Sequence, residues 1–205
     1  MTSKLNKFPY ATVGILILSI IFLFLQISGP TLESPGNPDI TVLGVLLPSK
    51  VLSGEWYRLL TACFLHSNGS HLIGNFIPIV TCGLLIENRM GSWRFLFYIF
   101  TIGIVGNVAW FILNMDAVNI YCLGSSGITC GLIPLATLYL YKTFGTLFGK
   151  TVANGLLFVM LANILFEIYI TIYESDSNVA RIVHLGSYLV GIVLGLIYAE
   201  IHRRK

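Results

Sequence analysis

Apolar residues along the chain fall into six blocks that contain few charged side chains. Blocks of this kind are typical of helices that cross a lipid bilayer. The second and fourth blocks are short, which is tolerated where protein or water, not lipid, surrounds the helix ends. The pattern predicts an all-α membrane protein, a bundle of six transmembrane helices. The predicted spans are 10–28, 71–86, 93–114, 126–141, 151–173 and 179–201.

The longest connection, residues 29–70, contains four prolines and a half-apolar stretch at 56–65. That stretch is too short and too polar to span, so we expect it to lie along the membrane interface. At the N-terminus, Lys4 and Lys7 precede the apolar run 11–27, as in a signal peptide. The run is long for a signal peptide and lacks a small-x-small cleavage pattern, so we interpret it as a retained first helix. We expect one membrane domain over residues 1–205.

Composition agrees with this class, because 56% of residues are hydrophobic and only 10% are charged. A soluble domain carries about 25% charged residues. No basic cluster with interleaved aromatic residues indicates nucleic-acid binding. Neither a His-Glu-x-x-His sequence nor paired cysteines indicate a metal site, and we expect no cofactor. The four cysteines, which we interpret as small apolar packing residues, are Cys63, Cys82, Cys122 and Cys130.

Basic residues near the span ends predict the orientation, because cytoplasmic loops are enriched in Lys and Arg. One side holds Lys4, Lys7, Arg89, Arg94, Lys142, Lys150, Arg203, Arg204 and Lys205. The other side holds Lys50, Arg58 and Arg181. We therefore expect an integral, multi-pass plasma-membrane protein with both termini in the cytoplasm and the long first loop outside.

Polar side chains converge at one depth near the predicted outer face. His71 and Asn75 lie at the start of the second span, and Ser126 opens the fourth. His184 lies five residues into the sixth span, roughly 8 Å along a helix that rises ~1.5 Å per residue. Polar groups inside a bilayer are costly and are therefore functional candidates. The coincidence of depth indicates a site that faces the outside.

Ser126 lies in the sequence Gly124-Ser125-Ser126-Gly127, which predicts a tight, glycine-flanked turn entering a helix. A helix N-terminus also offers free N–H groups to a developing oxyanion. Small residues then recur at a spacing of four on the fourth and sixth spans, which permits close helix contact. These small residues are Gly127 and Gly131 on the fourth span and Ser187, Gly191 and Gly195 on the sixth. Because His184 precedes Gly191 by seven residues, it shares the contact face and can reach Ser126.

Each of these features alone has a simpler interpretation. A Gly-x-Ser-Gly sequence is common by chance, small-residue rows are usually packing seams, and a single intramembrane histidine is as often structural as catalytic. Together they favour a catalytic site. On the fifth span, Asn163 and Glu167 are four residues apart and share a face, and Glu167 lies about 9 Å from the outer end. They are either the wall of a substrate entrance or, as we favour, a carboxyl group reaching the interface.

Through the motifs that contain His71, Ser126 and His184, the chain resembles the rhomboid family of intramembrane proteases. The resemblance extends in family order from about residue 55 to 195. It rests on Trp56 and Arg58 in the outer loop, His71 and Asn75 as His-x-x-x-Asn, Glu87 and Arg89 in a Glu-x-Arg-x-Gly turn, the Gly-x-Ser-Gly motif, and His184 with glycines two and seven residues later.

The resemblance implies a Ser-His dyad without a third acid, with Ser126 as nucleophile and His184 as general base. It also implies an oxyanion site made by the Ser126 N–H, His71 and Asn75, and transmembrane helices as substrates. Two positions depart from the family. Ser187 replaces a common glycine, and Cys130 stands where many relatives carry an aromatic residue on which the histidine ring rests.

Two other classes of function stay open. A rhomboid-like protein without activity would bind membrane helices and not cut them, although such relatives generally lack the serine or the histidine. A small channel or transporter would place polar groups across the bilayer, whereas here they gather at one depth. The sequence does not indicate the oligomeric state or the physiological target.

Overall fold

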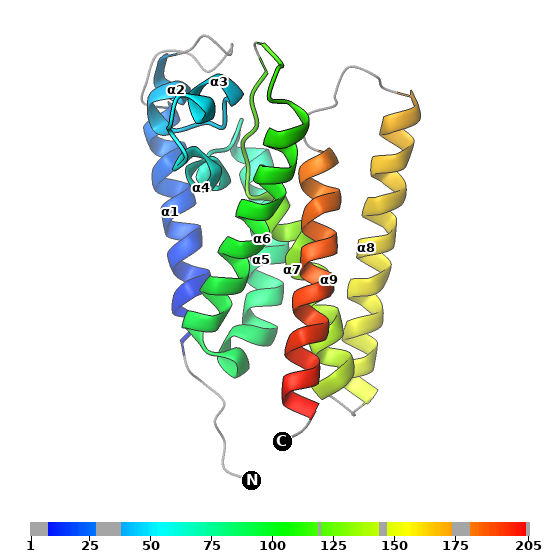
Figure 1. Cartoon of the computed structure of the whole chain (residues 1–205). Coiled ribbons are helices and arrows are strands. Elements are labelled where there is room, and N and C mark those ends of the chain that lie inside the picture. Colours follow the sequence, from blue (N-terminus) through cyan, green and yellow to red (C-terminus); the bar gives the residue numbers. More distant parts are fainter. Residues whose placement is uncertain (1–7, 28–37, 119, 144–146, 174–180, 204–205) are drawn as a thin grey trace.

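A computed structural model of the chain describes residues 8–27, 38–118, 120–143, 147–173 and 181–203. Within these residues the regular structure is helical, apart from one isolated antiparallel bridge between Leu46 and Cys122. Six long helices stand side by side in one bundle (Figure 1). They are α1 (Tyr10–Ile27), α5 (Gly69–Met90), α6 (Ser92–Leu113), α7 (Ser126–Thr143), α8 (Leu147–Tyr173) and α9 (Arg181–Arg203).

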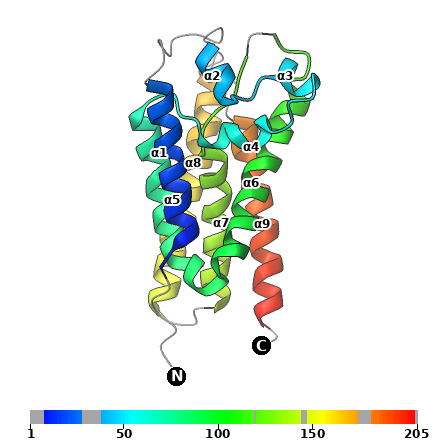
Figure 2. The same ribbon diagram turned by 90° about the vertical axis from the view of Figure 1, so that its left-hand side faces the viewer.

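Four short helical segments gather at one end of the bundle, and we call residues 38–64 the loop cap. They are α2 (Pro38–Leu43), α3 (Pro48–Leu52), α4 (Arg58–Thr61) and the 3₁₀ segment η1 (Ala62–Phe64). Helix α1 begins and α9 ends at the opposite end of the bundle (Figures 1 and 2). The predicted interfacial stretch 56–65 thus corresponds to two short helical turns and not to a span.

Each predicted apolar segment coincides with one long helix. Four of the described helices, α5, α6, α8 and α9, are long and apolar enough to cross a membrane, and α1 is a shorter apolar helix. Helix α7 lies outside this group. These helices make the chain an integral, multi-pass membrane protein.

The structure differs from the sequence pattern at the end of α5. The apolar pattern ends this helix at residue 86, whereas the structure continues it to Met90 and stops at Gly91, where φ is +88°. Glu87 and Arg89 therefore lie in the last helical turn, and the turn between helices that the sequence indicates is confined to Gly91. The helix can extend past its apolar segment because the Glu87 carboxylate finds partners there.

Those partners attach α1 to the α5–α6 junction. Glu87 is buried, and its two carboxylate oxygens accept hydrogen bonds from the backbone N–H of Ala11 at 2.8 Å and of Thr12 at 2.9 Å. The hydroxyls of Thr12 and Ser92 donate to the same carboxylate, each at 2.6 Å. Since the first N–H groups of a helix lack intrahelical acceptors, Glu87 satisfies the N-terminus of α1.

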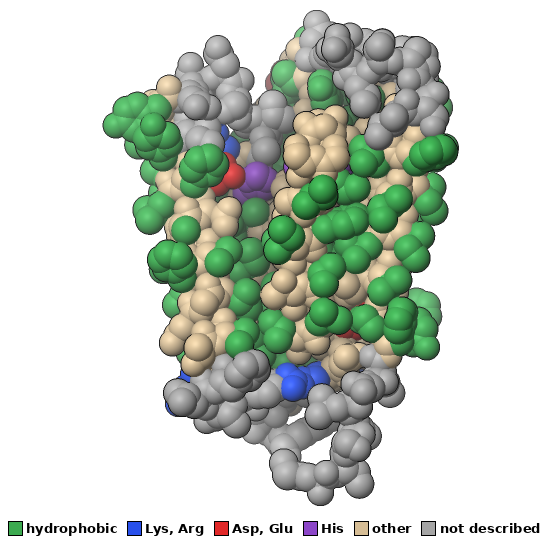
Figure 3. Space-filling view, turned by 180° about the vertical axis from the view of Figure 1, so that it is seen from behind, with side chains coloured by type: hydrophobic (Ala, Val, Ile, Leu, Met, Phe, Trp, Pro, Cys, Tyr) green, Lys and Arg blue, Asp and Glu red, His purple; other side chains and the backbone are tan. Residues whose placement is uncertain are grey.

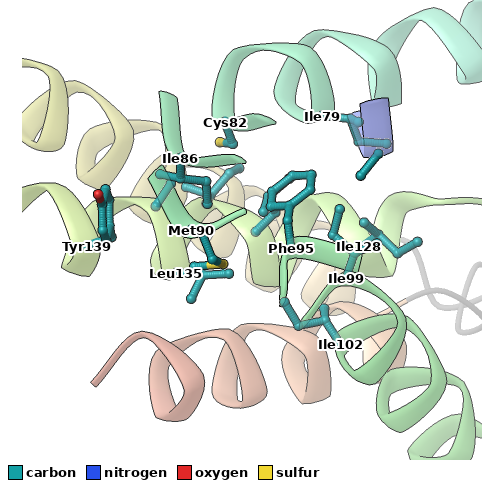
Figure 4. Packing of buried hydrophobic residues seen from close by; sticks show 14 of the residues in the cluster. Ile79, Cys82, Ile86, Met90, Phe95, Ile99, Ile102, Ile128, Leu135 and Tyr139 are labelled. Atoms are coloured by element: carbon teal, nitrogen blue, oxygen red, sulfur yellow. The ribbon is translucent and has the colours of Figure 1, made fainter. Parts of the chain in front are cut away.

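Helix α7 occupies the centre of the bundle and contacts α5, α6, α8 and α9 (Figure 2). Its residues Leu132, Leu135 and Ala136 are fully buried. Apolar side chains of α5, α6 and α7 meet in the main core, among them Phe95 and Ile99 (Figure 4). Because other helices surround α7, it needs less hydrophobicity than a lipid-facing helix.

Small residues bring α7 and α9 into backbone contact. A Cβ added at Gly191 would lie 2.0 Å from the backbone oxygen of Gly131, and one added at Gly131 would lie 2.6 Å from the backbone oxygen of Ser187. A Cβ at Gly127 would meet the Val183 side chain at 2.7 Å. The small-residue rows predicted on the fourth and sixth spans therefore face each other, and this close approach positions the start of α7 beside the start of α9.

The loop cap is held by the buried side chain of Arg58. Its guanidinium donates to the backbone oxygens of Thr41 and Val45 at 2.8 and 2.9 Å, and its Nε donates to Glu55 at 2.9 Å. Hydrogen bonds from the Tyr57 hydroxyl and from Arg58 lower the pKa of Glu55 to about 2, so this ion pair persists at neutral pH. Trp56, in contrast, is exposed and meets Phe111 edge to face.

Candidate active site

The segment before α7 is fixed by the loop cap. Its backbone forms the bridge between Cys122 and Leu46, and the Gly124 N–H donates to the backbone oxygen of Ala62 at 2.9 Å. Gly124 has a φ of +120°, which side-chain-bearing residues rarely adopt. A Cβ there would also lie 2.9 Å from the imidazole of His71. The glycine thus permits both the turn into Ser126 and the close approach of His71.

His66 supports the residue that precedes the candidate nucleophile. Its ring is fully buried, and Nδ1 lies 3.2 Å from the backbone oxygen of Phe64, which can only accept. Nδ1 therefore carries the proton, and Nε2 accepts from the Ser125 hydroxyl at 3.0 Å. Burial, reinforced by the nearby His71, lowers the pKa of His66 to about 4, so the ring is neutral at neutral pH. The side chain of Gln26 brackets the His66 backbone with two further hydrogen bonds and ties α1 to this site.

Ser126 begins α7, and its side chain meets His184 from the first turns of α9. The distance between Ser126 Oγ and His184 Nε2 is 2.8 Å. The other ring nitrogen of His184, Nδ1, lies 2.6 Å from Oε1 of Glu167 on α8. The hydroxyl, the imidazole and the carboxylate thus form a continuous hydrogen-bonded row across three helices.

This row lies in a partly open part of the surface. The side chains of His184 and Glu167 are 13% and 20% exposed. In Figure 3, acidic and histidine side chains adjoin in a hollow beside α8, toward the end of the bundle that carries the loop cap. The site is therefore sheltered among helices yet open enough for water.

Asn75 lies one turn below His71 on α5 and is buried. Its Oδ1 is 3.5 Å from the Thr129 hydroxyl, while its Nδ2 has no hydrogen-bond partner among the described residues. His71 Nδ1 lies 3.2 Å from the Ser67 hydroxyl. The imidazole of His71 rests against Gly124. A buried amide donor without a partner is costly, and this one lies beside the turn that carries Ser126.

All four residues selected from the sequence, Ser126, His184, His71 and Asn75, are therefore brought together. Two others were not selected: the sequence favoured an interfacial role for Glu167, and His66 was given no role. For Glu167 a signal existed: it lies about as far from the outer end of its helix, ~9 Å, as His184 lies from its own, ~8 Å. For His66 no spacing rule applied, because the residue lies in a loop that the tertiary structure folds onto Ser125.

Cys130 follows Ser126 by one turn, is partly exposed and is a free thiol, as are the other three cysteines. Among the described residues, no aromatic ring stacks on His184. Its ring is instead held by polar contacts at both nitrogens.

Comparison with known proteins identifies the fold family. The sequence profile of the Rhomboid domain matches residues 53–201. Rhomboid protease GluP of Bacillus subtilis is 26% identical over 189 residues, which cover 92% of this chain and 35% of that protein. Putative rhomboid protease YdcA of Bacillus subtilis is 25% identical over 205 residues, covering 98% of this chain and 94% of that protein.

A third relative, Rhomboid protease AarA of Providencia stuartii, is 22% identical over 205 residues, covering 91% of this chain and 72% of that protein. The chain spans only about a third of GluP and nearly all of YdcA. Since the profile covers more than half of the 205 residues and includes Ser126, His184 and Glu167, this membrane protein belongs to the rhomboid family.

Proposed function

We propose that this chain is an intramembrane serine endopeptidase in which Ser126 is the nucleophile and His184 the general base. The observation that carries the proposal is the 2.8 Å contact between Ser126 Oγ and His184 Nε2. A serine hydroxyl is a weak nucleophile at neutral pH and gains reactivity when a base is within hydrogen-bond reach. The contact joins residues 58 positions apart through the backbone packing of α7 on α9.

In the proposed reaction, Ser126 Oγ attacks a peptide carbonyl carbon while its proton passes to His184 Nε2. The tetrahedral intermediate collapses when the same nitrogen gives this proton to the leaving amine. Water, activated by His184 in turn, then hydrolyses the acyl ester and regenerates the Ser126 hydroxyl. The openness of the site near the loop cap supports this step, because water has to reach the ester.

The developing oxyanion would be bound by the Ser126 backbone N–H, the Asn75 amide and the His71 imidazole. Two observations support this assignment. The Asn75 Nδ2 is a buried donor without a partner in the described structure, and the His71 ring lies against Gly124, two residues before Ser126. Donors that are fixed before the reaction stabilise the transition state without reorganisation.

We further propose six transmembrane spans, with α1 and α7 crossing the bilayer beside the four longer apolar helices. Both termini are cytoplasmic, the active site faces the outside, and the membrane is the plasma membrane. Arg89, Arg94, Lys142 and Lys150 all lie at helix ends remote from the loop cap, which supports this orientation. Figure 3 shows Lys and Arg side chains at the end of the molecule opposite the hollow.

Substrates of this site would be transmembrane helices that unwind locally and enter it from the bilayer. The names of the three relatives as rhomboid proteases support this class of reaction. The alternative is an inactive family member that binds helices without cutting them. The presence of both Ser126 and His184, in hydrogen-bond contact, favours the protease.

Reconstitution of the purified protein with a fluorescently labelled single-span substrate tests the proposal. We expect cleavage by the wild type, together with covalent modification of Ser126 by a serine-directed phosphonate, located by mass spectrometry of the modified peptide. Ser126→Ala and His184→Ala should abolish both, whereas Ser53→Ala, which removes an exposed loop hydroxyl, should retain both. A folded wild type that neither cleaves nor reacts would support the binding protein instead, and cleavage by Ser126→Ala would reject the nucleophile.

A further inference from the structure

Glu167 on α8 contacts the candidate general base on the side opposite the nucleophile. Its Oε1 lies 2.6 Å from His184 Nδ1, while His184 Nε2 lies 2.8 Å from Ser126 Oγ. This is the order of groups in a Ser-His-acid triad. Nothing in the function proposed above requires the carboxylate, since a serine and a histidine suffice for proton transfer.

The contact has a defined consequence for the protonation of His184. To accept the Ser126 proton, Nε2 has to be unprotonated, so a neutral imidazole carries its proton on Nδ1. Of the two groups that flank the ring, only the Glu167 carboxylate can accept that proton at Nδ1. Glu167 thus selects the tautomer that can act as a base and also fixes the plane of the ring. After proton transfer, the same carboxylate faces the imidazolium.

Two further titratable groups lie near this pair, Arg181 and His71. Arg181, buried on α9 one turn before His184, interacts electrostatically with Glu167. On α5, His71 lies near enough to His184 to interact with it. Glu167 is the acidic group in contact with the imidazole of His184 among the described residues.

The residue one turn earlier on α8 provides an internal comparison. The Asn163 side chain donates to the backbone oxygen of Val159 on its own helix, at 2.9 Å, and is exposed. Glu167 instead extends between helices to α9. A carboxylate that was stabilised only by water or lipid headgroups would point away from the bundle and not toward α9.

The surroundings of His184 show what the contact with Glu167 contributes to the orientation of the imidazole ring. No aromatic ring among the described residues packs on its imidazole, and Cys130, one turn after Ser126, offers only a thiol. The ring is therefore oriented by its two hydrogen bonds. Without Glu167, one bond to Ser126 would leave the imidazole free to rotate about that contact and to place its proton on either nitrogen.

We propose that Glu167 is a positioning residue that converts the Ser126–His184 dyad into a triad. The inference rests on the proposed protease function. In soluble serine proteases, replacing the acid by its amide lowers kcat by ~10⁴-fold. Glu167 is partly exposed, so screening by water should reduce its contribution, and we expect a loss of roughly 10- to 100-fold.

The test compares Glu167→Gln, Glu167→Ala and Glu167→Asp with Asn163→Ala as the control on the same helix. We expect Gln and Ala to lower kcat and the rate of phosphonate reaction at Ser126 while KM stays near the wild-type value. Asp, which retains the charge, should recover part of the lost rate. The thermal unfolding midpoint in detergent identifies any variant that loses activity through unfolding.

A spectroscopic measurement separates positioning from general support. In protein labelled with ¹⁵N-histidine, a hydrogen bond from Nδ1 to a carboxylate should give a far-downfield proton resonance, absent in His184→Ala and in Glu167→Ala. If Glu167→Gln and Glu167→Ala both react and cleave at the wild-type rate, the triad is overturned while the protease proposal stands. If the wild type itself is inert, the failure lies with the proposed function.

Discussion

Asn75 is the residue whose unpaired side-chain N–H the proposed chemistry explains best. A buried N–H donor without a partner costs free energy in the resting protein, and an oxyanion beside Ser126 would provide the missing acceptor. Stability alone gives no reason for such a donor, because Leu would fill the same space without that cost. The unsatisfied group therefore indicates a role in binding or catalysis.

Replacement of Asn75 by Ala should accordingly leave the fold intact and slow the reaction. Loss of one preorganised donor to an oxyanion lowers kcat by roughly 10²- to 10³-fold, or ~3–4 kcal/mol of transition-state stabilisation. Steady-state cleavage of a labelled substrate checks this, with Asn163→Ala as the control amide outside the site. Wild-type turnover in Asn75→Ala would remove this residue from the oxyanion site.

At this scale the sequence indicated some members of the site and not others, for a physical reason. Ser126, His184, His71 and Asn75 lie at helix starts, so counting residues from the span ends placed them at one depth. Glu167 lies near the end of its helix, and its depth was measurable in the same way. What the sequence could not show is the direction of its side chain, which depends on how α8 and α9 are rotated relative to each other.

At the scale of elements, the packing of α7 against α9 determines whether the side chains of Ser126 and His184 can meet. The two helices meet through backbone atoms at Gly131 and Gly191, so their separation is set by the absence of side chains. Ser126 and His184 lie five and seven residues before these glycines. Any change that widens the seam would lengthen the 2.8 Å contact between their side chains.

Gly191→Ala should therefore weaken both stability and activity. The new methyl would lie 2.0 Å from the Gly131 oxygen, and because that atom belongs to the backbone, a helix has to move. Overpacking of this kind costs about 1–3 kcal/mol. We expect a lower thermal midpoint in detergent and slower phosphonate reaction at Ser126.

Gly186→Ala is the matched control, since it adds the same methyl to the same helix. There the new atom would lie 3.5 Å from the Ala109 side chain, an ordinary contact. This variant should keep the wild-type midpoint and reaction rate. Equal effects of the two substitutions would show that helix propensity, and not the seam, determines the outcome.

The spacing of small residues predicted this seam correctly, because a repeat of four on each helix defines a face. The boundary of α5 was wrong at its end, because hydropathy does not register a polar residue whose hydrogen bonds lie inside the protein. Glu87 lies past the apolar run, but its carboxylate is satisfied by Thr12 and Ser92 and the helix continues. The fixation of α1 through Glu87 was likewise invisible in the sequence, since it joins residues 75 positions apart.

For the whole molecule, the central position of α7 explains why this helix does not have to be as apolar as the four candidate spans α5, α6, α8 and α9. The helix that carries Ser126 is surrounded by four others and so is free to bear Thr129, Thr137 and small residues at little cost. A catalytic hydroxyl needs such a helix, because a lipid-facing segment would give the site no shelter and no partners. Because α7 is enclosed in this way, its crossing of the bilayer has to be tested by experiment and not by its hydropathy.

Cysteine labelling decides this point. Lys50 is partly exposed and Lys142 is exposed, and α5, α6 and α7 separate them, so three crossings would place them on opposite sides. In right-side-out vesicles, a membrane-impermeant maleimide should modify Lys50→Cys directly and Lys142→Cys only after permeabilisation. The unsubstituted chain, with three buried cysteines and the partly exposed Cys130, sets the background. Modification of both positions from the outside would mean that α7 does not cross, whereas the reverse pattern would invert the protein and place the site in the cytoplasm.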